Sequence, residues 1–176
     1  MSLTDAVVAA DLGPAGLEFL ERIGAEVSLP LPPPPPYHSP ASCGPEHGRF
    51  DSAEMIDVDD PEMPAKVNAD WLHMATEYGI FDSRREFLLS VDYSDPDEVE
   101  PEFAWVRVRL SDQWDLAGSN SIALRSGFGG LFIDRFVPEF SMLSVDRKAM
   151  LNTTVWGRGT VSTIVIRPDR LMHVID

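Results

Sequence analysis

The sequence predicts a mainly β domain of the α+β class: an antiparallel sandwich or small barrel, preceded by a helix and a proline-rich N-terminal arm. Three observations lead to this class. Apolar and polar residues alternate in two long segments, several further short runs have the composition of strands, and glycine or proline separates these runs. Antiparallel sheets with one face toward water produce such alternation.

Two neighbouring strands are expected in residues 87–93 and 103–110. In the first, Phe87, Leu89 and Val91 alternate with Ser90 and Asp92, and the second reads FAWVRVRL after the turn-forming residues SDPDE. Further strands are expected in the runs SIALR, LFIDRFV, LNTTVW, TVSTIVIR and LMHVI. The residues WGRGT lie between two of these runs and predict a tight hairpin.

Helices are predicted in two places. Val67, Trp71, Met74 and Tyr78 recur at three- and four-residue spacing, which predicts a helix that ends at Gly79. Residues 4–24 also carry helical signals, because Thr4 is a suitable N-cap and the leucines and isoleucine at positions 17, 20 and 23 are three residues apart. One or two short helices are expected there.

The chain of 176 residues suits one domain with an appendage. We divide it into a short helical segment (1–27), a proline-rich acidic arm or linker (28–64) and a β-rich globular domain (65–176). The middle part is dense in proline and acid and has little periodic apolar pattern, so it is expected to be extended, with Pro32 to Pro36 in polyproline II conformation.

The formal net charge is -15, and residues 1–102 carry 22 of the 29 acidic residues but only 5 of the 14 basic ones. Such a surface disfavours direct binding of nucleic acid or anionic lipid, which requires basic side chains. No stretch approaches the roughly 20 apolar residues of a membrane-spanning helix, so no integral membrane association is expected. The expected partner is another protein or a second copy of the chain.

No catalytic signature is present. The glycine-rich SGFGG precedes no helix, and no G-x-S-x-G pentapeptide occurs. His38, Cys43, His47 and Asp51 are spaced as metal ligands, but their proline- and glycine-rich surroundings favour loop histidines over a rigid metal site. The sequence therefore predicts no catalytic residue, no metal and no cofactor. A single cysteine and an N-terminus without a basic signal region predict a cytoplasmic protein, or a virion protein if the chain is viral.

One short motif carries a binding mechanism. Pro34, Pro35, Pro36 and Tyr37 resemble the PPxY ligand of WW domains, in which a polyproline II segment docks into an aromatic groove and the tyrosine anchors it. This resemblance implies partner-binding roles for Pro34, Pro35 and Tyr37. The alternative is that the proline run is a stiff spacer.

Two large aromatic residues complete the candidate binding residues. Trp114 lies in the polar segment SDQWDLAGSN and Phe128 in SGFGG, where the pattern predicts exposure, and exposed aromatics are favoured interface anchors. The alternative is that both pack onto the core. We therefore predict a non-enzymatic structural or assembly protein that acts through protein-protein interaction, such as a component of a viral or phage particle. The alternatives are an adaptor that presents PPxY to a WW domain and a small enzyme with a dispersed active site.

Overall fold

The computed structural model describes residues 3–25, 49–51, 54–94, 102–125, 136–156 and 159–166. Within these ranges, eight strands form one antiparallel sheet in the order β1-β5-β4-β6-β7-β8-β2, and β3 pairs with β8 outside that path. The elements are α1 (Asp5–Leu12), η1 (Gly13–Ala15), β1 (Leu17–Gly24), β2 (Arg49–Asp51), β3 (Ile56–Asp57), α2 (Met63–Glu77), β4 (Glu86–Asp92), β5 (Phe103–Leu110), η4 (Ile122–Leu124), β6 (Phe140–Leu143), β7 (Met150–Trp156) and β8 (Thr160–Ile166). The predicted class, mainly β and antiparallel with a few short helices, is confirmed.

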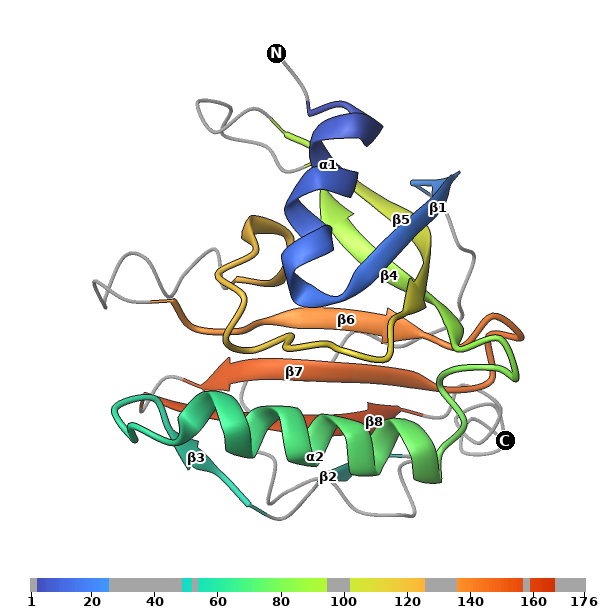
Figure 1. Ribbon diagram of the computed structural model, residues 1–176. Helices are drawn as coiled ribbons and strands as arrows, with labels where there is room; N and C mark the ends of the chain where they lie inside the picture. The colour runs from blue at the N-terminus through green and yellow to red at the C-terminus, as the bar shows by residue number, and fades with distance from the viewer. Residues whose placement is uncertain are drawn as a thin grey trace.

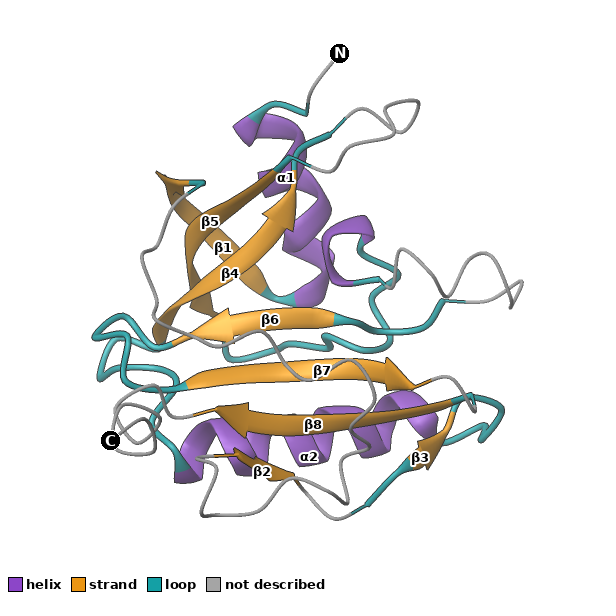
Figure 2. Cartoon of the chain, turned by 180° about the vertical axis from the view of Figure 1, so that it is seen from behind, coloured by secondary structure: helices purple, strands orange, loops and turns teal. Residues whose placement is uncertain are grey.

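Both α-helices lie against the same side of the sheet. Figure 1 shows α2 along β7 and β8 and α1 in front of β4, and Figure 2, seen from behind, shows the strands in front of both helices. The strands β4 and β5 run obliquely to β6, β7 and β8, as the twist of a large sheet produces. The hydrophobic core fills the space between the helices and this face of the sheet.

The two predicted neighbouring strands build the centre of this core. β4 pairs with β5 at seven positions, and Phe87, Leu89 and Val91 lie directly opposite apolar residues of β5. All three side chains are buried. The two-residue alternation therefore predicted both strands and the face that each turns inward.

The helix α2 begins at Met63 and covers this face. Val67, Trp71 and Met74 are buried, as their spacing predicted. The Trp71 ring lies 6.0 Å from that of Phe87, and its Nε1 donates a hydrogen bond to Met142 on β6. The Trp71 side chain of α2 therefore contacts both β4 and β6.

The predicted hairpin is present between β7 and β8, which pair at seven positions from Met150↔Ile166 to Trp156↔Thr160. Gly159 has a φ of 72°, a left-handed conformation that glycine adopts without strain. Thr153 and Thr163 face each other inside the pair, with their hydroxyl groups 2.9 Å apart.

The prediction of helix for residues 17–24 is wrong, because this segment is strand β1. Within residues 4–24, α1 and the short 3-10 helix η1 are helical, and the Oγ1 atom of the α1 N-cap Thr4 accepts a hydrogen bond from the N–H of Val7. β1 pairs with β5, but its register shifts between Phe19 and Glu21 and again between Arg22 and Gly24. These irregularities interrupt the two-residue alternation, so the sequence shows a spacing that resembles a helix.

The run SIALR is also not a strand. Ile122–Leu124 form the 3-10 helix η4. The N–H groups of Ile122 and Ala123 each donate to the carboxylate of Asp11 at 3.0 Å. This side chain of α1 determines the local conformation, and nothing near positions 121–125 in sequence reveals it. The run LMHVI and positions 131–135 of LFIDRFV lie outside the described residues.

Two strands, β2 and β3, lie within the segment 28–64. β2 and β3 both pair with β8, and Ile56, Val58 and Met63 are buried in a second apolar cluster beneath α2. These strands and the three buried side chains are part of the sheet and its core. Positions 28–48 lie outside the described residues.

The opposite face of the β1-β5-β4 part carries an ion-pair network. Its centre is Glu86, whose side chain is only 2% exposed. Arg107 donates to it through Nε at 2.9 Å and Arg109 through Nη2 at 2.7 Å, and the same arginines also contact Glu21 and Glu18 of β1. The Arg109 hydrogen bond, supported by Arg107, lowers the pKa of Glu86 although its burial opposes this.

Candidate binding pocket between β4 and β6

The sheet opens between β4 and β6. β4 pairs with β5 along its whole length but with β6 at only two positions, Leu88↔Leu143 and Leu89↔Met142. Beyond this point the strands diverge, because β4 turns away with β5 while β6 continues beside β7. The two strands are therefore joined at one end and separated at the other.

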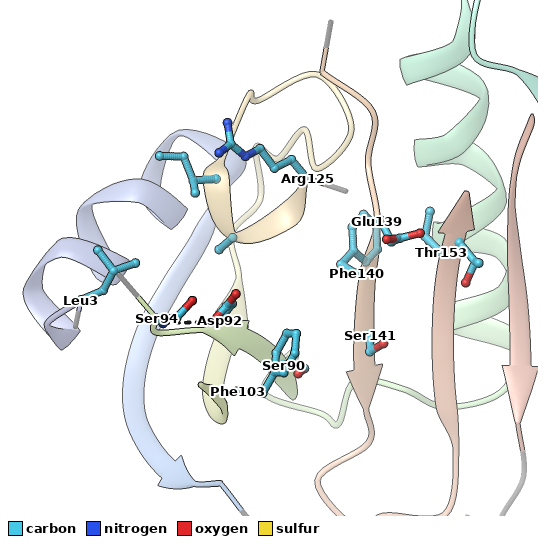
Figure 3. A pocket seen from close by; sticks show the side chains of 13 residues that line it. Leu3, Ser90, Asp92, Ser94, Phe103, Arg125, Glu139, Phe140, Ser141 and Thr153 are labelled. Atoms are coloured by element: carbon cyan, nitrogen blue, oxygen red, sulfur yellow. Dashed lines mark hydrogen bonds between the residues drawn. The ribbon is translucent and has the colours of Figure 1, made fainter. Parts of the chain in front are cut away.

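A cavity of about 460 Å³ lies where the strands separate. Figure 3 shows Ser90 and Asp92 of β4 on one side of it and Phe140 and Ser141 of β6 on the other. Phe140 belongs to the core face of the sheet, whereas Ser90, Asp92 and Ser141 project from the other face. Residues of both faces line one cavity, because it lies at a gap between strands.

The backbone of both strands contributes to this cavity. The N–H of Tyr93 donates to the carbonyl of Glu102 at 2.7 Å, so the backbone groups of Tyr93 face β5. Neighbouring residues of a strand direct their backbone groups to opposite edges, so the N–H and carbonyl of Asp92 face the cavity. In the same way, the 2.9 Å bond from Ser144 to Ala149 places the backbone of Ser141 on the edge toward β4. The cavity is therefore bordered by the parts of β4 and β6 that extend beyond their last shared pair, Leu89↔Met142.

Exposed apolar side chains surround the mouth. Phe103 and Ile122 line the cavity, yet they are 54% and 60% exposed. Leu3 also lines it. We call Phe103 and Ile122 the apolar rim.

Charged groups stand at different sides of the cavity. Asp92 accepts hydrogen bonds through Oδ1 from the N–H groups of Ser94 and Glu102, at 2.9 and 3.1 Å. Glu139 accepts one from the N–H of Val155 at 2.9 Å. Arg125 lies on the η4 side, away from Asp92 (Figure 3), and it is exposed. The lining thus combines carboxylates, a guanidinium, hydroxyl groups and aromatic rings.

Of the binding residues predicted from the sequence, the structure places Trp114. Its side chain is half-buried and packs edge-on against Trp71, with the ring centroids 5.2 Å apart. Trp114 therefore packs onto the core, the alternative considered for it above. Pro34, Pro35, Tyr37 and Phe128 lie outside the described residues, and their partner-binding roles stay predictions.

A close backbone approach explains where Trp114 lies. Gly16 has a φ of 79°, and a Cβ atom there would lie 2.4 Å from the carbonyl oxygen of Gln113 and 2.6 Å from the Cα of Trp114. The N–H of Ser111 donates to the carbonyl of Gly16 at 2.9 Å. The glycine lets the segment around Trp114 lie directly against the start of β1, which directs the indole inward.

The pocket residues were not singled out from the sequence. By sequence, Phe103 begins one predicted strand, Ile122 lies in another, and Ser90 and Asp92 alternate with the apolar residues of a third. The only local signal is an aromatic residue on the polar face of a predicted strand, as at Phe103. The separation of β4 from β6 depends on pairing between segments about 50 residues apart, which no local pattern reveals.

No protein-family model, curated protein or solved structure matches this chain. None of the helices in the described part of the chain is long and apolar enough to cross a membrane. Among the same residues, no group of three or more histidine, cysteine, aspartate or glutamate side chains is arranged to hold a metal ion. The fold and the pocket are therefore interpreted from their own chemistry.

Proposed function

We propose that this protein is a non-enzymatic interaction module that binds a segment of a protein partner, or of another copy of itself, in the pocket between β4 and β6. The observation that supports it is the apolar rim: two large apolar side chains, each more than half exposed, that line a cavity of about 460 Å³. Exposed apolar residues gathered at a concave site are typical of interaction surfaces. A role in assembling a larger structure, such as a viral or phage particle, is one form of this proposal.

The composition of the pocket supports a peptide as the bound group. Phe103 offers an aromatic surface, Ser90 and Ser141 offer hydroxyl groups, and the strand edges offer backbone donors and acceptors. Aromatic anchors surrounded by polar groups recur at the energetic centres of protein interfaces. The same lining has the polar groups to orient a main chain and the apolar surface to bind a side chain.

A selection from a displayed library of random peptides tests this function. Peptides that bind the native protein should lose at least about tenfold in affinity when Phe103 or Ile122 is replaced by serine, since truncated interface anchors cost ~2 kcal/mol or more. The matched control is Leu72→Ser, which changes an apolar side chain that is 38% exposed on α2 and does not line the pocket.

Self-association is measured in parallel by analytical ultracentrifugation over a range of concentrations. An assembly that depends on the pocket should weaken in the Phe103→Ser and Ile122→Ser variants and persist in Leu72→Ser. If neither peptide binding nor self-association responds to the rim, the proposal is wrong. The adaptor and enzyme alternatives stay predictions, and the first has its own test in Tyr37→Ala, which removes the anchor of the PPxY motif.

A further inference from the structure

We infer that the occupant of the pocket is an extended, basic segment that adds as a strand to the edge of β4 past Leu89, with an apolar side chain on the apolar rim and a lysine or arginine beside Asp92. This inference rests on the proposed function, and it adds the conformation and the charge of the ligand. Three separate observations support this inference: the strand edge of β4, the cavity beside it and the charges around it.

An extended ligand follows from the strand edges. Past its last pair with β6, β4 directs the backbone N–H and carbonyl of Asp92 toward the cavity. A strand edge with such groups is a template for another extended chain, which pairs with it through main-chain hydrogen bonds. A partner strand in this gap would therefore continue the pairing along β4 beyond the point at which β6 diverges from it.

β4 offers the longer of the two edges. On the β6 side, the N–H of Glu139 donates to the carbonyl of Leu124 at 2.9 Å, and Arg125 forms an isolated bridge with Pro138. The chain leading into β6 is therefore already paired with the end of η4. Because β4 and β6 are antiparallel, an added strand is antiparallel to one of them and parallel to the other. We therefore place the ligand antiparallel to β4, because antiparallel pairing is the more stable and β4 has the longer edge.

The cavity supplies positions for side chains. A strand on the β4 edge alternates its side chains between the two faces of the sheet, about 3.4 Å apart along the chain. Phe103 lies directly opposite Asp92 in the β4–β5 pair, so the basic side chains of the ligand on that face lie near an exposed aromatic ring. On the other face the apolar side chains meet Ile122 and Leu3.

The charge of the ligand follows from Asp92 and from the whole protein. Both hydrogen bonds that Asp92 accepts from the backbone go to Oδ1, so Oδ2 is the atom placed to accept from a cationic side chain. The net charge of -15 attracts a basic chain over longer distances and repels an acidic one. Arg125, at the opposite side of the cavity, is placed to donate to a main-chain carbonyl of the ligand.

The experiment uses synthetic heptapeptides and the full-length protein. The probe alternates lysine and valine, and it is compared with a peptide that alternates glutamate and valine and with a block peptide of the same lysines and valines. Fluorescence anisotropy should show the alternating basic peptide binding at least about tenfold more tightly than either comparison peptide. Two further probes carry N-methyl groups, one on the valines and one on the lysines. Because only alternate N–H groups of a strand face a given neighbour, one methylated probe should lose far more affinity than the other.

Protein variants separate this inference from the proposed function. Asp92→Asn keeps an oxygen acceptor for the amides of Ser94 and Glu102 but removes the charge, so binding of the basic probe should fall several-fold and lose part of its salt dependence. The control, Glu77→Gln on α2, should leave binding unchanged. Equal binding of both methylated probes, or tighter binding of the glutamate peptide, overturns the inference while Phe103-dependent binding still supports the proposed function. If no peptide binds in a Phe103-dependent way and self-association does not depend on the apolar rim either, both are wrong.

Discussion

The two edges of strand β4 differ in how completely they are paired. Toward β5 the strand pairs at seven positions, and toward β6 at two. The first edge belongs to a continuous ladder above a buried core, whereas the second ends at a cavity with an apolar rim. One strand therefore holds the fold through one edge and presents backbone groups through the other.

The carboxylates at the two ends of β4 show the same contrast. Glu86 is buried and bound by two arginines of β5 that also reach β1. Asp92 is exposed, and the hydrogen bonds described for it come from backbone N–H groups. A carboxylate enclosed by arginines is a structural group, and one that is open to solvent beside a cavity is available to a ligand. The comparison predicts that changes near Glu86 affect stability and changes near Asp92 affect binding.

Proline substitutions give the largest expected contrast. Val91→Pro removes a buried side chain and an N–H group that faces β5, so we expect no cooperative unfolding transition in the purified variant. Ser141→Pro, in the open part of the junction, removes an N–H group that faces the cavity and should cost about 1 kcal/mol. Circular dichroism during urea unfolding measures both. Equal destabilisation by the two substitutions would contradict the assignment of an open and a closed edge.

Truncation of two apolar side chains on these strands should separate stability from binding. Leu89→Ala creates a cavity at a fully buried position and should cost roughly 2–5 kcal/mol of unfolding free energy. Phe103→Ala removes a ring that is 54% exposed, and it should change stability by no more than about 0.5 kcal/mol while weakening peptide binding. Chemical denaturation and anisotropy on the same samples check this. A large loss of stability in Phe103→Ala would show that the ring is part of the core.

Acid should release the contribution of the Glu86 network. The pKa of Glu86 is lowered in the folded protein, so the unfolded chain binds the proton more readily, and the stability that this group contributes is present above about pH 4.5 and lost as the pH falls through the lower folded value. Glu86→Gln should remove this contribution at neutral pH. The difference in unfolding free energy between the native protein and this variant, measured from pH 7 to pH 3, should therefore shrink below about pH 4.5. A difference that grows toward acid would reverse the sign and contradict the network.

Hydrogen exchange compares the two edges without a substitution and is the smallest perturbation. The amides of Leu89 and Val91 face β5 and should exchange at least about tenfold more slowly than the amide of Asp92, which faces the cavity. Residue-resolved exchange by NMR measures these rates. Addition of a bound peptide should then slow the Asp92 amide selectively. Equal protection of the three amides in the free protein would mean that the β4 edge is already paired.

The elements that the sequence predicted correctly have regular periods. Val67, Trp71 and Met74 indicated α2, and the alternation around Phe87 and Val106 indicated β4 and β5, because one face of each element is buried throughout. Sequence alone also predicted the β7–β8 hairpin, which is local and has a glycine where a positive φ is needed. In these cases local pattern and tertiary environment agree.

Tertiary structure alone decided the parts in which distant segments meet. β1 is a strand because β5 pairs with it in spite of two register shifts, η4 forms because Asp11 of α1 caps it, and Trp114 packs inward because Gly16 allows a close approach. The pocket depends on β4 and β6 separating after two pairs. Each of these outcomes is determined by contacts between residues far apart in the chain, whereas composition and periodicity report only on neighbours. The sequence by itself therefore determined the β-rich class and its main elements, and the three-dimensional pairing determined the candidate binding site.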